Sequence, residues 1–470
     1  MASFGVFDDS SDEEEQEGGG FAAAGGVGIS GHPCSLPAAI AVTANSLLSR
    51  TSATTIADLV KLEPVGGDSG KAARGLQRCL MLFSSALVVG ESASRDEMID
   101  AARVVEKFAW SHLEENKKWL EACWREAYIY AHVIIACCLV AESSAQEAMQ
   151  HVDKASVVGG NLKELKVLSR LIDPMARKEK DARAHKSHFG FIPKMQIARG
   201  ATPHPEAAPV PRWQGEARIS PEVFFKDFFS TATPLVLPGI SASWQALEKW
   251  RDLDYLSCEF GHRVVPIELG RHSEGGTWRE SFATVDDFIR DYIVPSCKEC
   301  SKDAFDALAA PLPPPQSVGY LAQHTLFEQT PRLLSDFEPA PADLCGACNR
   351  GEGIQRVNAW FGTHGTVTPL HFDSYDNFLC QVSGCKFVRL FSPSQTPRLY
   401  AVEKGADLTR SQGNISAVDV ESPDLDAHPD FVDAEYMDVV LREGDTLFIP
   451  KYYWHYVRSL SPSFSLNFWF

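Results

Sequence analysis

The chain has 470 residues, a formal net charge of −18 and a hydrophobic content of 44%, enough apolar material for two or three domains with real cores. The excess of carboxylates disfavours non-specific binding to nucleic acid or to an anionic membrane, because such binding needs a basic surface. Twelve cysteines are scattered along the chain and follow no recognisable signal peptide, so we expect a reducing compartment rather than a disulfide framework.

Residues 1–35 are acidic and rich in glycine. The run DDSSDEEEQEGGG carries seven carboxylates and offers too little apolar surface to offset the entropy of ordering, which predicts a disordered tail. Ser10 and Ser11 each have a glutamate three residues further on, a pattern typical of acidophilic kinase sites. A tail that only aids solubility is the simpler interpretation.

Residues 36–180 show apolar side chains at three- and four-residue spacing, which predicts a helical domain. The run AYIYAHVIIACCLVA at 127–141 is shorter than the roughly 20 residues that span a bilayer, and it contains His132, so we expect a buried helix. This domain offers no constellation suited to chemistry. We therefore expect it to be a scaffold or to dock a protein partner. The predicted helical segments are 37–50, 72–89, 96–110, 124–140 and 161–173.

Residues 181–212 are rich in proline and alanine and predict a linker. From 213 to 470 short β-branched and aromatic runs are bounded by Gly and Pro, which is typical of a barrel or jelly roll. The whole chain is thus predicted to be α+β, with helices first and a barrel second. The clearest strand-like runs are TPLVLPG, HRVVPIELG, GTVTPLHFD, NFLCQVSG, CKFVRLFSP, DTLFIP and SFSLNFWF.

The run LHFD places His371 and Asp373 two residues apart in a predicted strand. Alternate residues of a strand share a face, so both side chains point the same way, and burying them without partners would cost several kcal/mol. A divalent metal would compensate that cost. Taken alone, the pair is also explained by a buried histidine bonded to a carboxylate, a common structural arrangement.

His455, in GDTLFIPKYYWHYV, supplies a third candidate ligand after another predicted strand. Two histidines and one carboxylate match the facial triad that leaves positions open on Fe(II) for oxygen and a co-substrate. A zinc hydrolase with three protein ligands remains an alternative.

Lys386, in CKFVRLF, shares a face with the apolar Val388 and Leu390. If that face lines the barrel interior, the ammonium needs an anion to offset its desolvation, and a small carboxylate would serve. Asn377 and Thr368 are placed to hydrogen-bond the same anion. The alternative is a lysine on an edge strand with its head group in water.

The region from about 210 to 470 resembles the jumonji-C 2-oxoglutarate oxygenases, most closely the jumonji domain-containing protein 5 type. The stretches that carry the resemblance are GYLAQHTLFEQ, VNAWFGTHGTVTPLHFDSYDNFLCQVSGCKFVRLFSP, LFIPKYYWHYVRSL and SFSLNFWF. The resemblance implies a helical region ahead of a double-stranded β-helix, with Fe(II), 2-oxoglutarate and O₂ as the reactants that supply the chemistry. It also implies three metal ligands, His371, Asp373 and His455, and five residues that hold 2-oxoglutarate, Tyr320, Thr368, Asn377, Lys386 and Trp469.

The same resemblance implies a substrate pocket formed by Glu268, Gln323 and Trp360. From pattern alone Glu268 is more simply an outward-facing glutamate, whereas in the resembled type its position engages a substrate arginine. We therefore expect a protein hydroxylase acting on arginine in a basic protein or peptide. The alternatives are a histone methyl-lysine demethylase and an inactive domain that only binds peptides. We expect the protein in the nucleus, the cytoplasm or both.

Two Cys-x-x-Cys pairs raise the possibility of a structural zinc ion. Cys297 with Cys300, and Cys345 with Cys348, offer four thiolates. The pairs lie far apart in loop-like segments, which favours reduced free cysteines.

Overall fold

The structure is a computed structural model in which the chain divides into two compact units, with the boundary in the sequence between Arg183 and Ala184. The predicted tail 1–35, with Ser10 and Ser11, lies outside the described residues. So do most of the residues of the first two predicted helices. The structure describes residues 95–115, 122–160, 162–183, 188–196, 206–215, 218–271, 278–338, 341–402 and 413–470, and a few isolated positions at 40, 43–44, 46–48, 74–78, 81 and 204.

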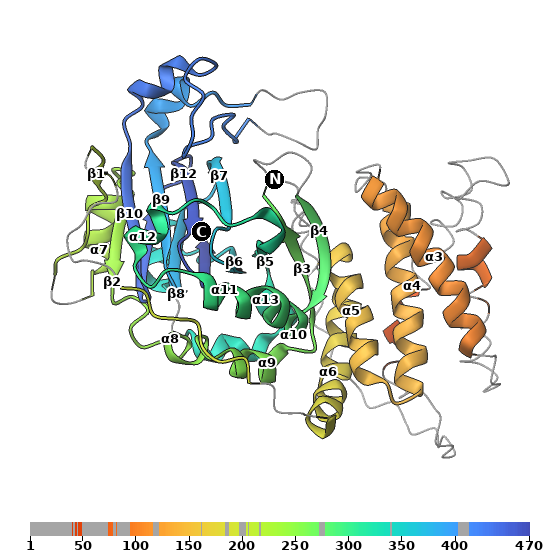
Figure 1. Ribbon diagram of the computed structural model, residues 1–470. Coiled ribbons are helices and arrows are strands. Elements are labelled where there is room, and N and C mark those ends of the chain that lie inside the picture. Colours follow the sequence, from red (N-terminus) through yellow and green to blue (C-terminus); the bar gives the residue numbers. More distant parts are fainter. Residues whose placement is uncertain are drawn as a thin grey trace. The chain divides into compact units, whose positions relative to one another are not determined.

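The first unit contains four long helices among its described residues (Figure 1). Three of them cover predicted helical segments. Helix α5 was missed, although its buried Ala148, Met149, Val152 and Ala155 recur at the helical spacing that would have revealed it. The four helices are α3 (Arg95–Glu115), α4 (Ala122–Ala141), α5 (Ala145–Gly159) and α6 (Lys163–Arg183).

Helix α4 is long and apolar enough to meet the length and composition of a membrane-spanning segment, but 89% of its most apolar window is buried inside the protein. It is buried on nearly every side, from Cys123 to Val140. A helix that is apolar all round serves equally as the core of a bundle, and α3 and α5 both pack against this one. This burial agrees with the prediction of a buried helix.

A buried histidine pair joins α4 to α5. The Nδ1 atoms of His132 and His151 lie 2.6 Å apart, and Nε2 of the fully buried His132 lies 3.4 Å from the Glu106 carboxylate on α3. Burial lowers the pKa of both histidines, and nearby Lys154 lowers each further. For His151 the pKa falls to about 3, so both rings are neutral at neutral pH.

We expect the helical unit to lose stability in acid because of this pair. The unfolded histidines take up protons near pH 6.5 while the folded ones do not, so stability is complete above 6.5 and falls as the pH drops towards 3. The loss is about 1.4 kcal/mol per pH unit for each histidine. Urea unfolding of the full chain followed by circular dichroism, at pH 7.5 and 5.5, measures it. His151→Gln should reduce the pH dependence of the free energy of unfolding, whereas replacing the exposed His188 by Gln should not. The same change of free energy with pH in both variants would contradict the explanation.

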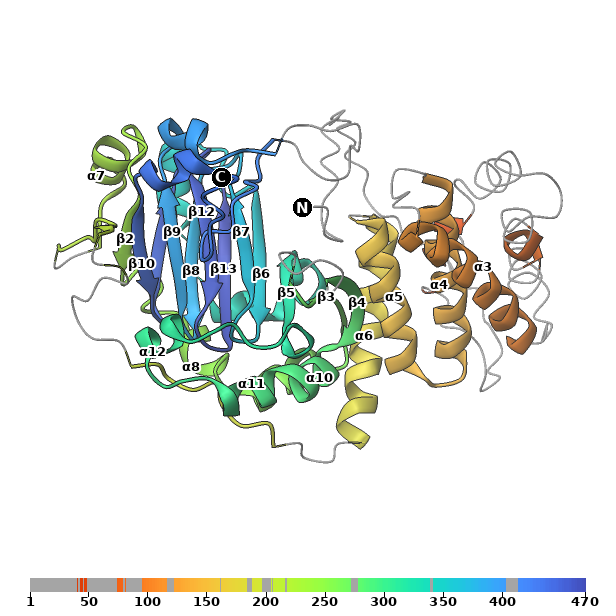
Figure 2. The ribbon, with the colours of Figure 1, turned by 45° about the horizontal axis from the view of Figure 1, so that its top comes forward.

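The second unit is built on two sheets that form a jelly roll, as predicted (Figures 1 and 2). The smaller sheet has the order β1-β10-β9-β12-β7 and the larger β2-β11-β8-β13-β6-β5-β3-β4. The strands of the smaller sheet are β1 (Ala208–Pro209), β7 (Val367–His371), β9 (Lys386–Phe391), β10 (Met437–Leu441) and β12 (Trp454–Ser459). Those of the larger sheet are β2 (Leu235–Pro238), β3 (Val264–Leu269), β4 (Arg279–Thr284), β5 (Gly319–His324), β6 (Arg356–Gly362), β8 (Asn377–Ser383), β11 (Asp445–Ile449) and β13 (Ser463–Trp469).

Short helices and turns complete this unit. Helices α8, α10 and α11 lie along one side of the barrel in both views (Figures 1 and 2). Their apolar faces join the aromatic core of the larger sheet, in which Trp250, Phe337 and Phe464 are buried. The α-helices are α7 (Pro221–Phe224), α8 (Ala246–Lys249), α9 (Leu253–Phe260), α10 (Val285–Phe288), α11 (Val294–Glu299), α12 (Ala304–Ala309), α13 (Leu326–Gln329) and α14 (Ala342–Cys348). The π-helical turns are Phe225–Phe229 and Ile289–Ile293, and the 3₁₀ helices are Pro315–Ser317, Pro331–Asp336, Pro393–Arg398 and Pro429–Asp433.

Residues 181–183 of the predicted linker continue helix α6, whereas the described residues from 188 to 212 include several that pack or pair with the barrel. Ile192 is fully buried in the core of the larger sheet. Strand β1 pairs with β10, and His204 Nδ1 lies 2.7 Å from the buried Asp438 carboxylate, which also binds Arg389. A proline-rich composition indicated irregular backbone, but it could not show that this backbone lies along a sheet edge.

Candidate metal and co-substrate site

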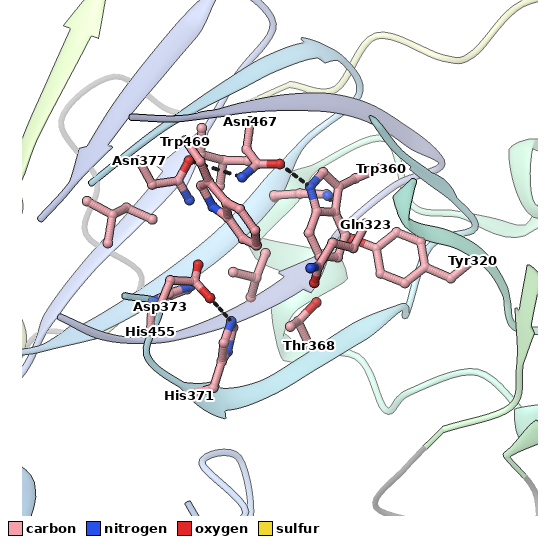
Figure 3. A pocket seen from close by; sticks show the side chains of 14 residues that line it. Tyr320, Gln323, Trp360, Thr368, His371, Asp373, Asn377, His455, Asn467 and Trp469 are labelled. Carbon is pink, nitrogen blue, oxygen red and sulfur yellow. Dashed lines mark hydrogen bonds and ion pairs between the residues drawn. The ribbon is translucent and has the colours of Figure 1, made fainter. Parts of the chain in front are cut away.

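Two strands of the smaller sheet supply the three candidate metal ligands. His371 ends β7, Asp373 follows it, and His455 lies in β12 directly opposite His371 in the antiparallel pairing. The ligand atoms of the three side chains all lie within 4.8 Å of one another (Figure 3). They form the only group of three or more His, Cys, Asp or Glu residues suited to a metal within the described part of the chain.

The backbone orients both imidazoles. His371 Nδ1 lies 2.8 Å from the carbonyl oxygen of Pro369, and His455 Nδ1 lies 2.9 Å from that of Tyr453. A carbonyl accepts only from a protonated Nδ1, so each Nε2 is left with a free lone pair. Burial lowers the pKa of His455 to about 4, which keeps it in the neutral form that binds metals.

The distances fit a single ion. Asp373 Oδ1 is 3.8 Å from His371 Nε2, and Asp373 Oδ2 is 3.7 Å from His455 Nε2. Two atoms bound to one first-row divalent metal at about 2.1 Å can be at most about 4.2 Å apart. Two nitrogens and one carboxylate on one side of the ion form the facial set that suits Fe(II) and leaves positions open for other reactants.

The pocket that the triad lines also contains a buried cation. Lys386 begins β9 and is 1% exposed. Its ammonium donates to the Tyr320 hydroxyl at 3.2 Å and lies 5.4 Å from that ring centroid and 6.0 Å from that of Trp360. No carboxylate of the described residues forms an ion pair with it. Burial therefore lowers its pKa to about 7, and an anionic ligand would relieve the desolvation.

Ten of the eleven site residues predicted from the sequence line this pocket together (Figure 3). They come from seven strands of the two sheets and from the loop after β7, so only the fold brings them within reach of one small molecule. The ten are Tyr320, Gln323, Trp360, Thr368, His371, Asp373, Asn377, Lys386, His455 and Trp469.

The pocket also contains Asn467, which sequence reasoning missed. Its amide accepts from the Trp360 indole at 2.8 Å and donates to Asn377 at 3.3 Å, joining three strands of the larger sheet (Figure 3). The signal was available, because Asn467 alternates with Trp469 in SFSLNFWF and so shares its face. Trp469 itself stacks on Tyr375, with ring centroids 5.2 Å apart.

Glu268 is the one predicted residue outside the pocket lining, and it lies next to it. In β3 it pairs directly with Tyr320 of β5, so the two side chains share a face. The Trp278 indole N–H donates to its carboxylate at 3.4 Å. Burial raises the pKa of Glu268 to about 7. Gln323 lies in the irregular part of β5 with a φ of 45°, close to the same wall.

The four cysteines considered for zinc carry free thiols, and no three of them form a metal-binding group among the described residues. Burial raises the pKa of Cys297 and Cys348 to about 12, and that of Cys345 further. Burial also raises the pKa of Cys300. All four are therefore thiols rather than thiolates at neutral pH.

Comparisons with known proteins agree with this geometry. A family model described as a cupin-like domain matches residues 221–470. Lysine-specific demethylase 8 of Danio rerio is 34% identical over 384 residues, covering 79% of this chain and 87% of the relative. JmjC domain-containing protein F of Dictyostelium discoideum is 30% identical over 418 residues, covering 77% of this chain and 86% of the relative.

A third relative, Jumonji C domain-containing protein 5 of Drosophila melanogaster, is 33% identical over 280 residues, covering 58% of this chain and 65% of the relative. The region that the family model matches contains strands β2 to β13 and the three candidate ligands. The chain therefore belongs to the JmjC family of cupin-like oxygenases, which use Fe(II) and 2-oxoglutarate.

Proposed function

We propose that this oxygenase hydroxylates an arginine side chain of a basic protein substrate. The observation that carries the proposal is Glu268, a carboxylate that shares a face with Tyr320 at the edge of the pocket. Its pKa of about 7 shows how costly its charge is in the free protein. A cationic substrate group would stabilise that charge.

Guanidinium suits this wall better than a methylated ammonium does. A carboxylate pairs with guanidinium through two parallel hydrogen bonds, and flat aromatic rings stack on its plane. Trp278 borders Glu268, and Trp360 lines the pocket nearby. A methylated ammonium has fewer N–H donors and is typically held by a cage of aromatic rings.

The demethylase alternative is favoured by the names of relatives, two of which are called lysine-specific demethylase 8. Both reactions would use the same metal and co-substrate, so only the substrate wall separates them. A domain that binds peptides without turnover is less well supported. The complete triad and the buried, unpaired Lys386 would have no purpose in such a domain.

The residues of the site would divide the work as follows. His371, Asp373 and His455 would hold Fe(II), which when bound supplies oxygen activation: 2-oxoglutarate is oxidised to succinate and CO₂, and one oxygen atom enters a substrate C–H bond. Lys386 and Tyr320 would bind the distal carboxylate of the co-substrate. Asn377, held by Asn467, would orient the co-substrate beside the metal. The apolar and aromatic walls would exclude water.

Removing a metal ligand should abolish turnover. His371→Ala and Asp373→Ala each leave two ligands, too few to hold Fe(II) in the facial arrangement. Succinate production under saturating iron and 2-oxoglutarate measures the effect. His364→Ala, which removes a partly buried histidine bonded to Ser296 outside the triad, is the matched control. Near-normal succinate from either ligand variant would show that the metal site is elsewhere.

Lys386 should make co-substrate binding depend on pH. Its pKa of about 7 in the free protein means that the cation is present below pH 7 and lost above it, so 2-oxoglutarate affinity should fall up to tenfold per pH unit above 7. Lys386→Ala should raise the 2-oxoglutarate KM ten- to a hundredfold, for the loss of about 1.5 to 3 kcal/mol. Lys386→Arg keeps its charge and should flatten the pH dependence between 7 and 8.5. An unchanged KM in the alanine variant would assign the lysine to another ligand.

Glu268 should decide the substrate. Glu268→Ala should lower kcat/KM for an arginine peptide at least thirtyfold, about 2 kcal/mol, while succinate formation without peptide persists. Wild-type peptide affinity should weaken below pH 7 as the carboxylate is protonated. Mass spectrometry for a 16-dalton gain on arginine is the measurement, and exposed Glu248→Ala is the control. Formaldehyde release from methyl-lysine peptides, with no gain on any arginine, would establish the demethylase instead.

A further inference from the structure

The candidate metal ligands come from two segments of the chain, and the turn that precedes one of them contacts the loop that follows the other. His371 and Asp373 come from the end of β7, and His455 follows the turn at residues 450–453 that joins β11 to β12. The β7–β12 pairing is irregular at this end, with a register shift just after His455. The position of Asp373 relative to His455 therefore depends on contacts beyond the ladder of strand hydrogen bonds.

Two consecutive backbone N–H groups of this turn supply those contacts. Lys451 N–H donates to the Asp376 side chain at 3.0 Å, and Tyr452 N–H donates to the backbone carbonyl of Asp373 at 2.8 Å. Tyr452 has a φ of 64°, a left-handed conformation that costs a residue other than glycine about 1 to 2 kcal/mol. Such a conformation persists where surrounding contacts require it. Here the two hydrogen bonds clamp the turn onto residues 373–376.

Asp376 also joins this clamp to the co-substrate side of the pocket. Its backbone carbonyl accepts from Phe470 N–H at 3.1 Å, next to Trp469, and Asn377 follows it in the chain. Asp376 is 8% exposed, so water replaces its hydrogen bonds poorly, and a carboxylate that accepts from a backbone N–H forms one of the stronger hydrogen bonds in proteins. One residue thus connects the β7–β8 loop with the β11–β12 turn through its side chain, and with Phe470, which follows β13, through its backbone carbonyl.

We propose that Asp376 is a positioning residue of the metal site. Its carboxylate accepts from Lys451 N–H and so fixes the position of the turn at residues 450–453. That turn bonds to the Asp373 carbonyl through Tyr452 N–H and thereby keeps Asp373 within reach of the ion that His371 and His455 would bind. Asp376 touches neither metal nor substrate. The inference rests on the triad being the metal site, and loss of this contact lowers metal affinity in the manner of other residues that support ligands.

Metal binding tests this role directly. The full chain, freed of metal, is titrated with Co(II), and the visible absorption of the bound ion reports both affinity and ligand geometry. Asp376→Ala is expected to weaken Co(II) binding ten- to a hundredfold and to change the spectrum. Asp376→Asn keeps an oxygen that accepts from Lys451 N–H, so its affinity should stay within threefold of wild type.

Glu443→Ala is the matched control. Glu443 also accepts from a backbone N–H, that of Gly384 at 3.2 Å, but beyond the other end of β8, about 20 Å from Asn377. It should lose stability without losing Co(II) affinity. Co(II) binding within threefold of wild type in Asp376→Ala overturns the proposal. So does an equal loss in Glu443→Ala, or a failure of Asp376→Asn to restore binding.

Two further variants complete the test. If Asp376→Ala does not fold, Asp376→Ser replaces it, because the shorter hydroxyl does not reach Lys451 N–H. If neither folds, Asp376 supports the fold as a whole and the proposal is overturned. His371→Ala separates the two levels of inference. Wild-type Co(II) binding in that variant would refute the metal site itself, whereas loss there without loss in Asp376→Ala refutes only the positioning role.

Discussion

The antiparallel pairing of β7 with β12 is the constraint on which the site depends. It places His371 directly opposite His455 across two strands that are more than 80 residues apart in the chain. Side chains directly opposite in such a pair have Cβ atoms about 4.5 to 5.5 Å apart, which is close enough for both imidazoles to reach one ion. Asp373 completes the set because it is two residues beyond His371. The metal geometry is therefore a consequence of strand register, and a shift of one residue would turn one histidine to the opposite face.

The barrel interior around this pair is more polar than an ordinary protein core. Lys386, Asn377 and Asn467 are all nearly inaccessible to solvent, and each buried polar group costs free energy unless it is hydrogen-bonded. Asn467 donates to Asn377 and accepts from the Trp360 indole. Among the described residues, the partners of the Lys386 ammonium are the Tyr320 hydroxyl and the rings of Tyr320 and Trp360. The fold thus buries the Lys386 ammonium at a cost in desolvation free energy, and an anionic ligand would stabilise its charge.

Lys386 and Glu268 respond to burial in opposite directions. Burial lowers the pKa of the lysine and raises that of the glutamate, each to about 7. One favours an anion and the other a cation, and both residues lie beside Tyr320. Burial therefore disfavours two charges of opposite sign beside one aromatic residue, and a ligand of the opposite charge would stabilise each of them.

Much of this could be predicted from the amino-acid sequence by itself. Alternating apolar residues bounded by Gly and Pro predicted seven of the barrel strands, and the spacing of His371 and Asp373 placed both on one face, because strand and helix periods are local properties of the chain. Two elements that were not predicted differ in how visible they are in the sequence. Helix α5 has the helical spacing and could have been found, whereas strand β4, with the sequence RESFAT, is partly exposed and polar and has no strong alternation.

The tertiary structure decided what depends on residues far apart in the chain. Whether Lys386 faces the interior, whether Glu268 faces Tyr320, and whether segment 181–212 lies along a sheet edge all depend on which strands pair and in what register. So does the contact of Asp376 with Lys451, 75 residues later. A sequence pattern specifies which residues share a face of a strand. Only the long-range pairing of strands specifies whether that face lies in the interior, lines the pocket or faces solvent.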